Sequence, residues 1–89
     1  MKLKENFITH SSVDGTVLLA IGEETKNFHG IVKLNETASL IVEALKEDTT
    51  LEKIVSKMKK EYPDVDETVL SSDVREVLDQ LESIHALIQ

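Results

Sequence analysis

The alternation of apolar and polar residues in the first third of the chain predicts three short β-strands. The predicted strands cover residues 8–13, 16–21 and 28–34, where β-branched and aromatic residues gather between turn-forming ones. Asp14 and Gly15 separate the first two strands. This pair favours a type I′ hairpin turn, which needs positive φ at two successive residues. The N-terminal third is therefore expected to form a small antiparallel sheet.

Apolar residues recur at three- and four-residue spacing in the rest of the chain, which is the period of an amphipathic helix. The first predicted helix covers residues 36–46 and has Asn35 as its N-cap, whose side-chain oxygen accepts from a free backbone N–H. A second helix follows Thr49, which is expected to form a capping box with Glu52. This helix ends shortly before Pro63, because proline disfavours helical backbone at the residue before it.

The third predicted helix starts at Asp66 or Asp64 and reaches about Ile84. One of its faces is apolar and the other acidic, with Leu70, Val74, Val77, Leu78, Leu81 and Ile84 on the first and Asp73, Glu76, Asp79 and Glu82 on the second. The tail after it is expected to pack back as a short extension. This order of elements predicts an α+β, winged-helix-like fold, with an N-terminal three-stranded antiparallel β-sheet followed by a three-helix bundle, in a single domain over residues 1–89.

Negative charge is concentrated in the helical part of the chain. The protein has 10 Lys and Arg against 17 Asp and Glu, which gives a net charge of −7. All of this excess lies in residues 36–89, because residues 1–35 carry four basic and four acidic residues. Such a surface repels nucleic-acid phosphates and anionic lipid and suits a basic peptide or protein. No apolar run is long enough to span a membrane and the first residues lack a signal-peptide core, so a cytoplasmic location is expected.

Patterns typical of catalysis or metal binding are missing from the sequence. It has no cysteine, and His10, His29 and His85 are scattered, with no carboxylate at ligand spacing. The serines have no neighbouring histidine and no Gly-x-Ser-x-Gly turn. We therefore expect no enzyme activity, no metal and no cofactor. Four lysines within residues 53–60 form a basic cluster, which is either a solvated helix face or a docking surface for an acidic partner.

Three segments, taken in order, resemble one protein family. They are the strand-to-helix segment of residues 28–38, the threonine-led helix start of residues 49–55, and residues 62–66, which lead into the third helix. By their order and spacing the chain resembles the PqqD family of pyrroloquinoline quinone biosynthesis over nearly its whole length. It departs from the family pattern at Val42, where an aromatic residue is common. It also departs at Ala86, where a glycine is common, so a left-handed helix cap is expected to be disfavoured there.

The resemblance implies a peptide-binding function without catalysis. Proteins of this family bind the leader segment of a ribosomally synthesised precursor peptide as an added β-strand, and they present it to a radical S-adenosylmethionine enzyme or another modifying enzyme. Relatives serve many peptide systems, so the pathway stays open. Carried onto this chain, the resemblance implies a peptide site formed by the third strand and the third helix: Phe28, His29, Gly30, Ile31, Val32 and Lys33 from the strand, and Ser71, Val74, Arg75 and Leu78 from the helix.

Two alternatives stay open at the level of the sequence. An uncovered strand edge can also pair with a second copy of the chain, which would give a homodimer. The protein could instead be a winged-helix module that binds protein or DNA without any precursor peptide. The third helix is acidic and has Arg75 as its only basic residue, so the phosphates beside a DNA major groove would repel this helix. We therefore expect no nucleic-acid partner.

Overall fold

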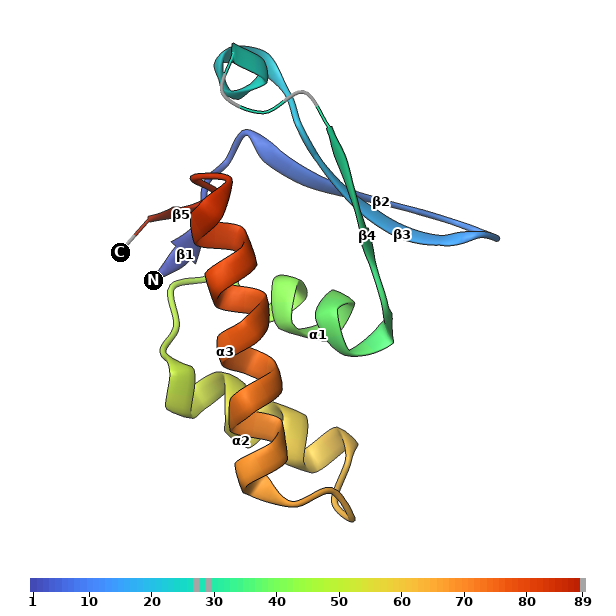
Figure 1. Ribbon diagram of the computed structural model, residues 1–89, viewed down its shortest axis with the longest axis vertical. Coiled ribbons are helices and arrows are strands. Elements are labelled where there is room, and N and C mark those ends of the chain that lie inside the picture. The colour runs from blue at the N-terminus through green and yellow to red at the C-terminus, as the bar shows by residue number, and fades with distance from the viewer. Residues whose placement is uncertain (27, 29, 89) are drawn as a thin grey trace.

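The computed structural model describes residues 1–26, 28 and 30–88. Figure 1 shows a twisted three-stranded sheet beside three helices, with α3 running past the other two helices toward the sheet. In chain order the elements are β1 (Lys2–Leu3), β2 (Phe7–Ser12), β3 (Gly15–Ala20), the 3-10 helix η1 (Gly22–Lys26), β4 (Ile31–Leu34), α1 (Glu36–Ala44), α2 (Leu51–Glu61), α3 (Glu67–Ser83) and β5 (Leu87–Ile88). The predicted α+β, winged-helix-like fold is confirmed.

The three-stranded sheet is antiparallel and has the order β2-β3-β4. Leu18 on the central strand β3 lies opposite Thr9 on β2 and Val32 on β4. β4 is therefore an edge strand, as the sequence predicted for its third strand. It is shorter than predicted, because it begins at Ile31 rather than at residue 28.

The hairpin between β2 and β3 differs from the predicted turn. Ser12 pairs with Gly15, so Val13 and Asp14 form the loop. Gly15, directly after this loop, has a φ of 120°, and neither of the two loop residues has a positive φ. A type I′ turn needs two successive positive values, so that prediction is wrong. A single glycine after the loop supplies the unusual backbone conformation instead.

The start of α2 also differs from the prediction. Thr50, and not Thr49, is the N-cap, and its hydroxyl accepts a hydrogen bond from the Lys53 backbone N–H at 3.3 Å. Thr49 is buried, and its backbone N–H donates to the Met1 carbonyl oxygen at 2.8 Å. This contact between distant parts of the chain holds Thr49 outside the helix. A capping pattern in the sequence involves only neighbouring residues, so it does not predict such a contact.

α3 ends in a left-handed cap, contrary to the expectation drawn from Ala86. His85 has a φ of 58°. Its N–H donates to the Glu82 carbonyl and the Ala86 N–H donates to the Leu81 carbonyl, each at 2.9 Å. These two bonds form a Schellman motif, with His85 in the position that glycine usually takes. The chain then turns back, and β5 pairs with β1 in a two-stranded sheet. The sequence predicted a tail that packs back, but not this pairing.

The core lies where the sheet packs against the helices. Its completely or almost completely buried side chains come from the central strand and from every α-helix: Leu18, Ile41, Val42, Leu45, Ile54, Met58 and Val74. Val42 has no exposed surface, so an aliphatic side chain fills the place where the family often has an aromatic one. Because both β4 and α3 pack on this core, their relative position is fixed.

Candidate functional site

Within the described residues both outer strands of the three-stranded sheet, β2 and β4, have an open edge, and the β4 edge is the one that faces α3. β4 pairs with β3, with Lys33 opposite Val17, and no strand lies on its other side within the described residues. Its side chains alternate: Ile31 is 66% exposed, whereas Val32 is half-buried and packs against the core. The backbone N–H and C=O groups along such an edge are available to an added strand.

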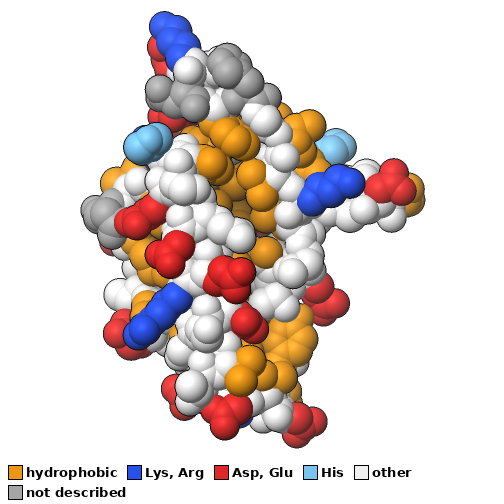
Figure 2. Space-filling view, viewed as in Figure 1, with side chains coloured by type: hydrophobic (Ala, Val, Ile, Leu, Met, Phe, Trp, Pro, Cys, Tyr) orange, Lys and Arg blue, Asp and Glu red, His pale blue; other side chains and the backbone are white. Residues whose placement is uncertain are grey.

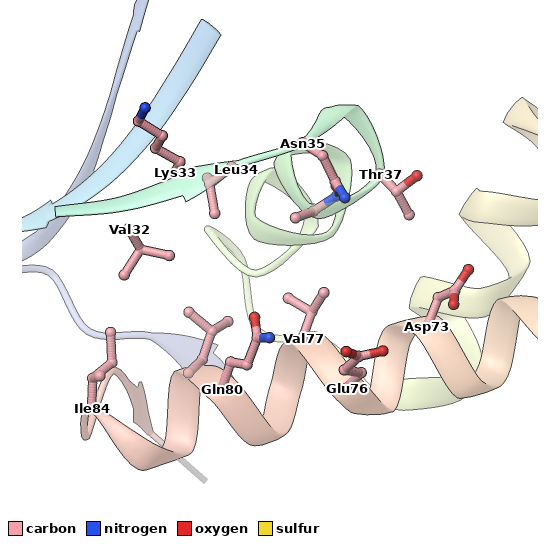
Figure 3. A pocket seen from close by; sticks show the side chains of 12 residues that line it. Val32, Lys33, Leu34, Asn35, Thr37, Asp73, Glu76, Val77, Gln80 and Ile84 are labelled. Carbon is pink, nitrogen blue, oxygen red and sulfur yellow. Dashed lines mark hydrogen bonds between the residues drawn. The ribbon is translucent and has the colours of Figure 1, made fainter.

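A groove of about 350 Å³ lies between this edge and α3. Figure 3 shows Val32 and Leu34 pointing from β4 toward α3, while Val77, Gln80 and Ile84 point back from α3. The described residues that line the groove are Val32, Lys33, Leu34, Asn35, Thr37, Ala38, Asp73, Glu76, Val77, Gln80, Leu81 and Ile84. Apolar side chains are also visible between the sheet and α3 in the space-filling view (Figure 2). The arrangement suits an extended chain that bonds to β4 and places alternate side chains in the groove.

The joint between β4 and α1 lies at one end of the groove and is held by side-chain hydrogen bonds. Asn35 Oδ1 accepts from the Ala38 backbone N–H at 2.8 Å, so α1 begins directly after the strand, as predicted. Tyr62, the C-cap of α2, donates its hydroxyl to Glu36 Oε1 at 3.1 Å. Partial desolvation, and to a lesser extent the bond to Glu36, raise the pKa of the Tyr62 phenol above its ordinary value.

Acidic side chains occupy the α3 wall at this same end. Asp73 is half-buried and Glu76 is exposed, and neither forms an ion pair with another described residue. Among the described residues that line the groove Lys33 is the only basic one, and its side chain points away from α3 (Figure 3). The groove is therefore negatively charged toward Asn35 and apolar toward Ile84.

The three residues of β4 that the sequence suggested as site residues lie at the open edge. Val32 and Lys33 line the groove, and Val32 directs its side chain into it. Ile31 is in the same strand, but it does not line the groove.

The other three suggested strand residues lie before β4. The Phe28 ring is half-buried and stacks on Phe7, with ring centroids 6.2 Å apart. A Cβ atom added at Gly30 would lie 3.2 Å from Phe28 Cζ, so the glycine makes room for this ring. His29 lies outside the described residues. Phe28 and Gly30 thus have a packing role at the entrance to β4.

None of the four suggested α3 residues lines the groove. Val74 is completely buried in the core, and Ser71 is half-buried. Arg75 and Leu78 line a separate depression that they share with residues at both ends of the chain. Successive residues of a helix are rotated by about 100°, so a residue next to Val74 faces a different neighbour.

The α3 residues that do line the groove flank the buried stripe, except Leu81, which belongs to it. They are Asp73, Glu76, Val77, Gln80, Leu81 and Ile84. The helical spacing predicted Val77, Leu81 and Ile84 on the apolar face of the helix, but it did not assign them to the groove. The signal in the sequence was a position where the apolar face of the helix meets its acidic face. A side chain at such a border can contact a second surface, here a bound strand, without leaving the core side of the helix.

The described part of the chain shows no metal-binding cluster. Within residues 1–26, 28 and 30–88, no cluster of three or more histidine, aspartate or glutamate residues could hold a metal ion. His10 and His85 are exposed and lie outside the groove. No helix in the described part of the chain has the length and apolar character needed to cross a membrane.

Together, the sheet, the helices and the groove define a small winged-helix-like α+β domain with an open strand edge. The chain belongs to the PqqD family: the family model described as coenzyme PQQ synthesis protein D (PqqD) matches residues 15–87. The resemblance seen in the sequence is thus confirmed. The matched range contains β4 and α3, so it includes both walls of the groove. Among curated proteins, none matches this sequence.

Two solved structures share this fold over nearly their whole length. TbiB1 in complex with the TbiA(beta) leader peptide is 26% identical, with a TM-score of 0.78, and the match covers 98% of this chain and 94% of that chain. Lasso peptide synthetase B1 complexed with the leader peptide is 23% identical, with a TM-score of 0.76, and the match covers 99% of this chain and 96% of that chain. The similarity therefore extends over the sheet and all three helices.

Proposed function

We propose that this protein binds the leader segment of a ribosomally synthesised precursor peptide as an added strand on β4, and that it has no catalytic activity of its own. The observation that carries the proposal is the open β4 edge beside a groove of about 350 Å³. Membership of the PqqD family supports it, as does the similarity to TbiB1, which was solved with a leader peptide.

In this proposal the affinity comes from backbone hydrogen bonds to β4, and the selectivity comes from side chains that enter the groove. Val32 and Lys33 remain in the proposed site. Its helix wall consists of the groove-lining residues of α3, in place of Ser71, Val74, Arg75 and Leu78. Phe28 and Gly30 contribute indirectly, since their packing sets where β4 begins.

An NMR amide titration tests this function. The labelled protein is titrated with leader segments of short peptides encoded beside its gene. Amide shifts should concentrate in β4 and in residues 73–84, because the added strand contacts these backbone and side-chain groups. Shifts confined to the Arg75 and Leu78 depression would contradict the proposed edge, and no shifts with any leader would contradict leader binding.

We further propose that the protein presents the bound leader to a modifying enzyme, of the radical S-adenosylmethionine class or another, in the cytoplasm where precursor peptides are made. The α2 surface supports this. Lys57 and Lys60 form no ion pair with a described residue and border a shallow pocket of about 270 Å³ whose apolar lining is Leu40, Ala44, Ile54 and Met58. Two carboxylates also line this pocket: Glu43, which pairs with Lys46, and Glu61. An acidic partner surface with one apolar side chain would complement it.

The double variant Lys57→Glu, Lys60→Glu should recover at least fivefold less of the partner enzyme in a pull-down, because it reverses the charge of this surface. Its affinity for the leader should stay unchanged, since α2 does not line the groove. Undiminished enzyme recovery would exclude α2 as the docking surface.

A further inference from the structure

The two ends of the groove differ in chemistry. Val32 and Ile84 face each other at one end, and both are apolar (Figure 3). At the other end Asp73 and Glu76 project from α3 near Thr37 (Figure 3). A side chain that suits the first end therefore does not suit the second.

The negative charge at the acidic end is not balanced by nearby protein groups. Asp73 and Glu76 have no ion-pair partner among the described residues, and the Lys33 side chain points away from them. The N-terminus of α1 also lies here and carries a partial positive charge. Asn35 already caps it, and Glu36 in its first turn adds a further negative charge.

The groove is long enough to take several side chains of one extended strand. Asp73 and Ile84 are 11 positions apart in the numbering of the chain, which corresponds to about 16 Å along a helix at ~1.5 Å per residue. Side chains on one face of a strand recur every ~6.6 Å. About three groove-facing side chains of a bound strand can therefore lie between the apolar and the acidic end.

We propose, as an extension that rests on the proposed leader binding, that the groove selects a strand whose groove-facing side chains are apolar at one end and basic at the other. A lysine or arginine beside Asp73 and Glu76 would gain charge-assisted hydrogen bonds in a partly enclosed position. Apolar side chains at the other positions would cover Val32, Val77 and Ile84. The preference for a basic residue at one end of the bound strand distinguishes this groove from a purely apolar strand-binding site.

A set of synthetic peptides tests the selectivity without knowledge of the natural leader. Each peptide has blocked termini and forms a strand with threonine on one face and three variable positions on the other. The variable positions are filled with leucine, lysine or glutamate. Dissociation constants are measured from amide shifts. Peptides with leucine at two positions and lysine at one end should bind about tenfold more tightly than those with glutamate at that end. The end that prefers lysine also reports the direction of the bound strand.

The double variant Asp73→Lys, Glu76→Lys should reverse this preference, so that the glutamate peptide binds more tightly. The control variant Glu47→Lys, Asp79→Lys changes the net charge equally, but neither residue lines the groove. It should keep the preference for lysine. Glu76→Gln, at an exposed position, should reduce the preference about threefold, and this milder change keeps the test valid if the double variant fails to fold.

The outcomes separate this inference from the proposed function. Equal affinity for lysine and glutamate peptides, with amide shifts in β4 and α3, would overturn the selectivity but leave strand addition in place. The same reversal of preference in the control variant would assign the effect to net charge and would also overturn it. Absence of binding by every peptide and every leader would overturn both proposals.

Discussion

The Gln80→Trp variant should lose at least tenfold in affinity for a peptide that binds the groove, while its helix content stays that of the native protein. Gln80 is exposed and projects from the α3 wall of the groove (Figure 3). An indole is much larger than an amide side chain, and it would cover the apolar lining that the peptide must reach. A tenfold loss corresponds to about 1.4 kcal/mol of binding free energy. Isothermal titration calorimetry measures the affinity, and far-UV circular dichroism measures the helix content.

Asp79→Trp is the matched control for this change. Asp79 is the adjacent residue of α3 and is also exposed, but it lines the separate depression and not the groove. Its replacement makes the same aromatic addition to the same helix. Unchanged peptide affinity is expected, and an equal loss in both variants would show that the groove is not where the peptide binds.

The Leu18→Ala variant should lower the free energy of unfolding by about 2–5 kcal/mol. Leu18 has no exposed surface and stands at the centre of the three-stranded sheet, between Thr9 and Val32. Its removal leaves a cavity that aliphatic neighbours cannot fill. A chain of 89 residues has a total stability of roughly 4–13 kcal/mol, so the variant should be close to unfolded at elevated temperature. Urea denaturation, with the slope compared between variants, measures the loss.

Leu19→Ala provides the comparison within the same strand. Leu19 is half-buried and, unlike Leu18, does not pack against the main core. The same side-chain truncation should therefore cost less than half as much. Similar losses in the two variants would contradict the assignment of the sheet's inner face.

Local sequence signals predicted much of the fold because their physical causes are local. Asn35 caps α1 by accepting a hydrogen bond from the residue three positions along, and Asp66 caps α3 by accepting one from the residue two positions along. The apolar stripe of α3 follows from helical spacing alone, and Leu70, Val74 and Leu81 are buried as that stripe predicts. The errors arise where distant segments meet. Thr49 is held by Met1, and β5 pairs with β1 across the length of the chain.

The candidate site was predictable in outline and not in detail. The edge position of β4 follows from its place as the last of three consecutive antiparallel strands. Which α3 residues face it depends on the rotation of that helix about its axis, and one position shifts a side chain by about 100°. The sequence therefore favoured Val74, which is in the core, over Val77, which lines the groove. Only the packing of α3 on α2 and α1 fixes that rotation.

The open edge of β4 also bears on how this protein avoids aggregation. An unpaired strand is a template for any other strand, including the same strand in a second copy, and repeated pairing of this kind leads to fibres. β4 is only four residues long, and the exposed Lys33 lies within it. Stacked copies would bring these lysines close together, and their repulsion opposes such growth. A guest strand that places an acidic or neutral residue beside Lys33 meets no such barrier there, whatever side chains it directs into the groove. One lysine can thus keep the edge open to a guest while it discourages self-association.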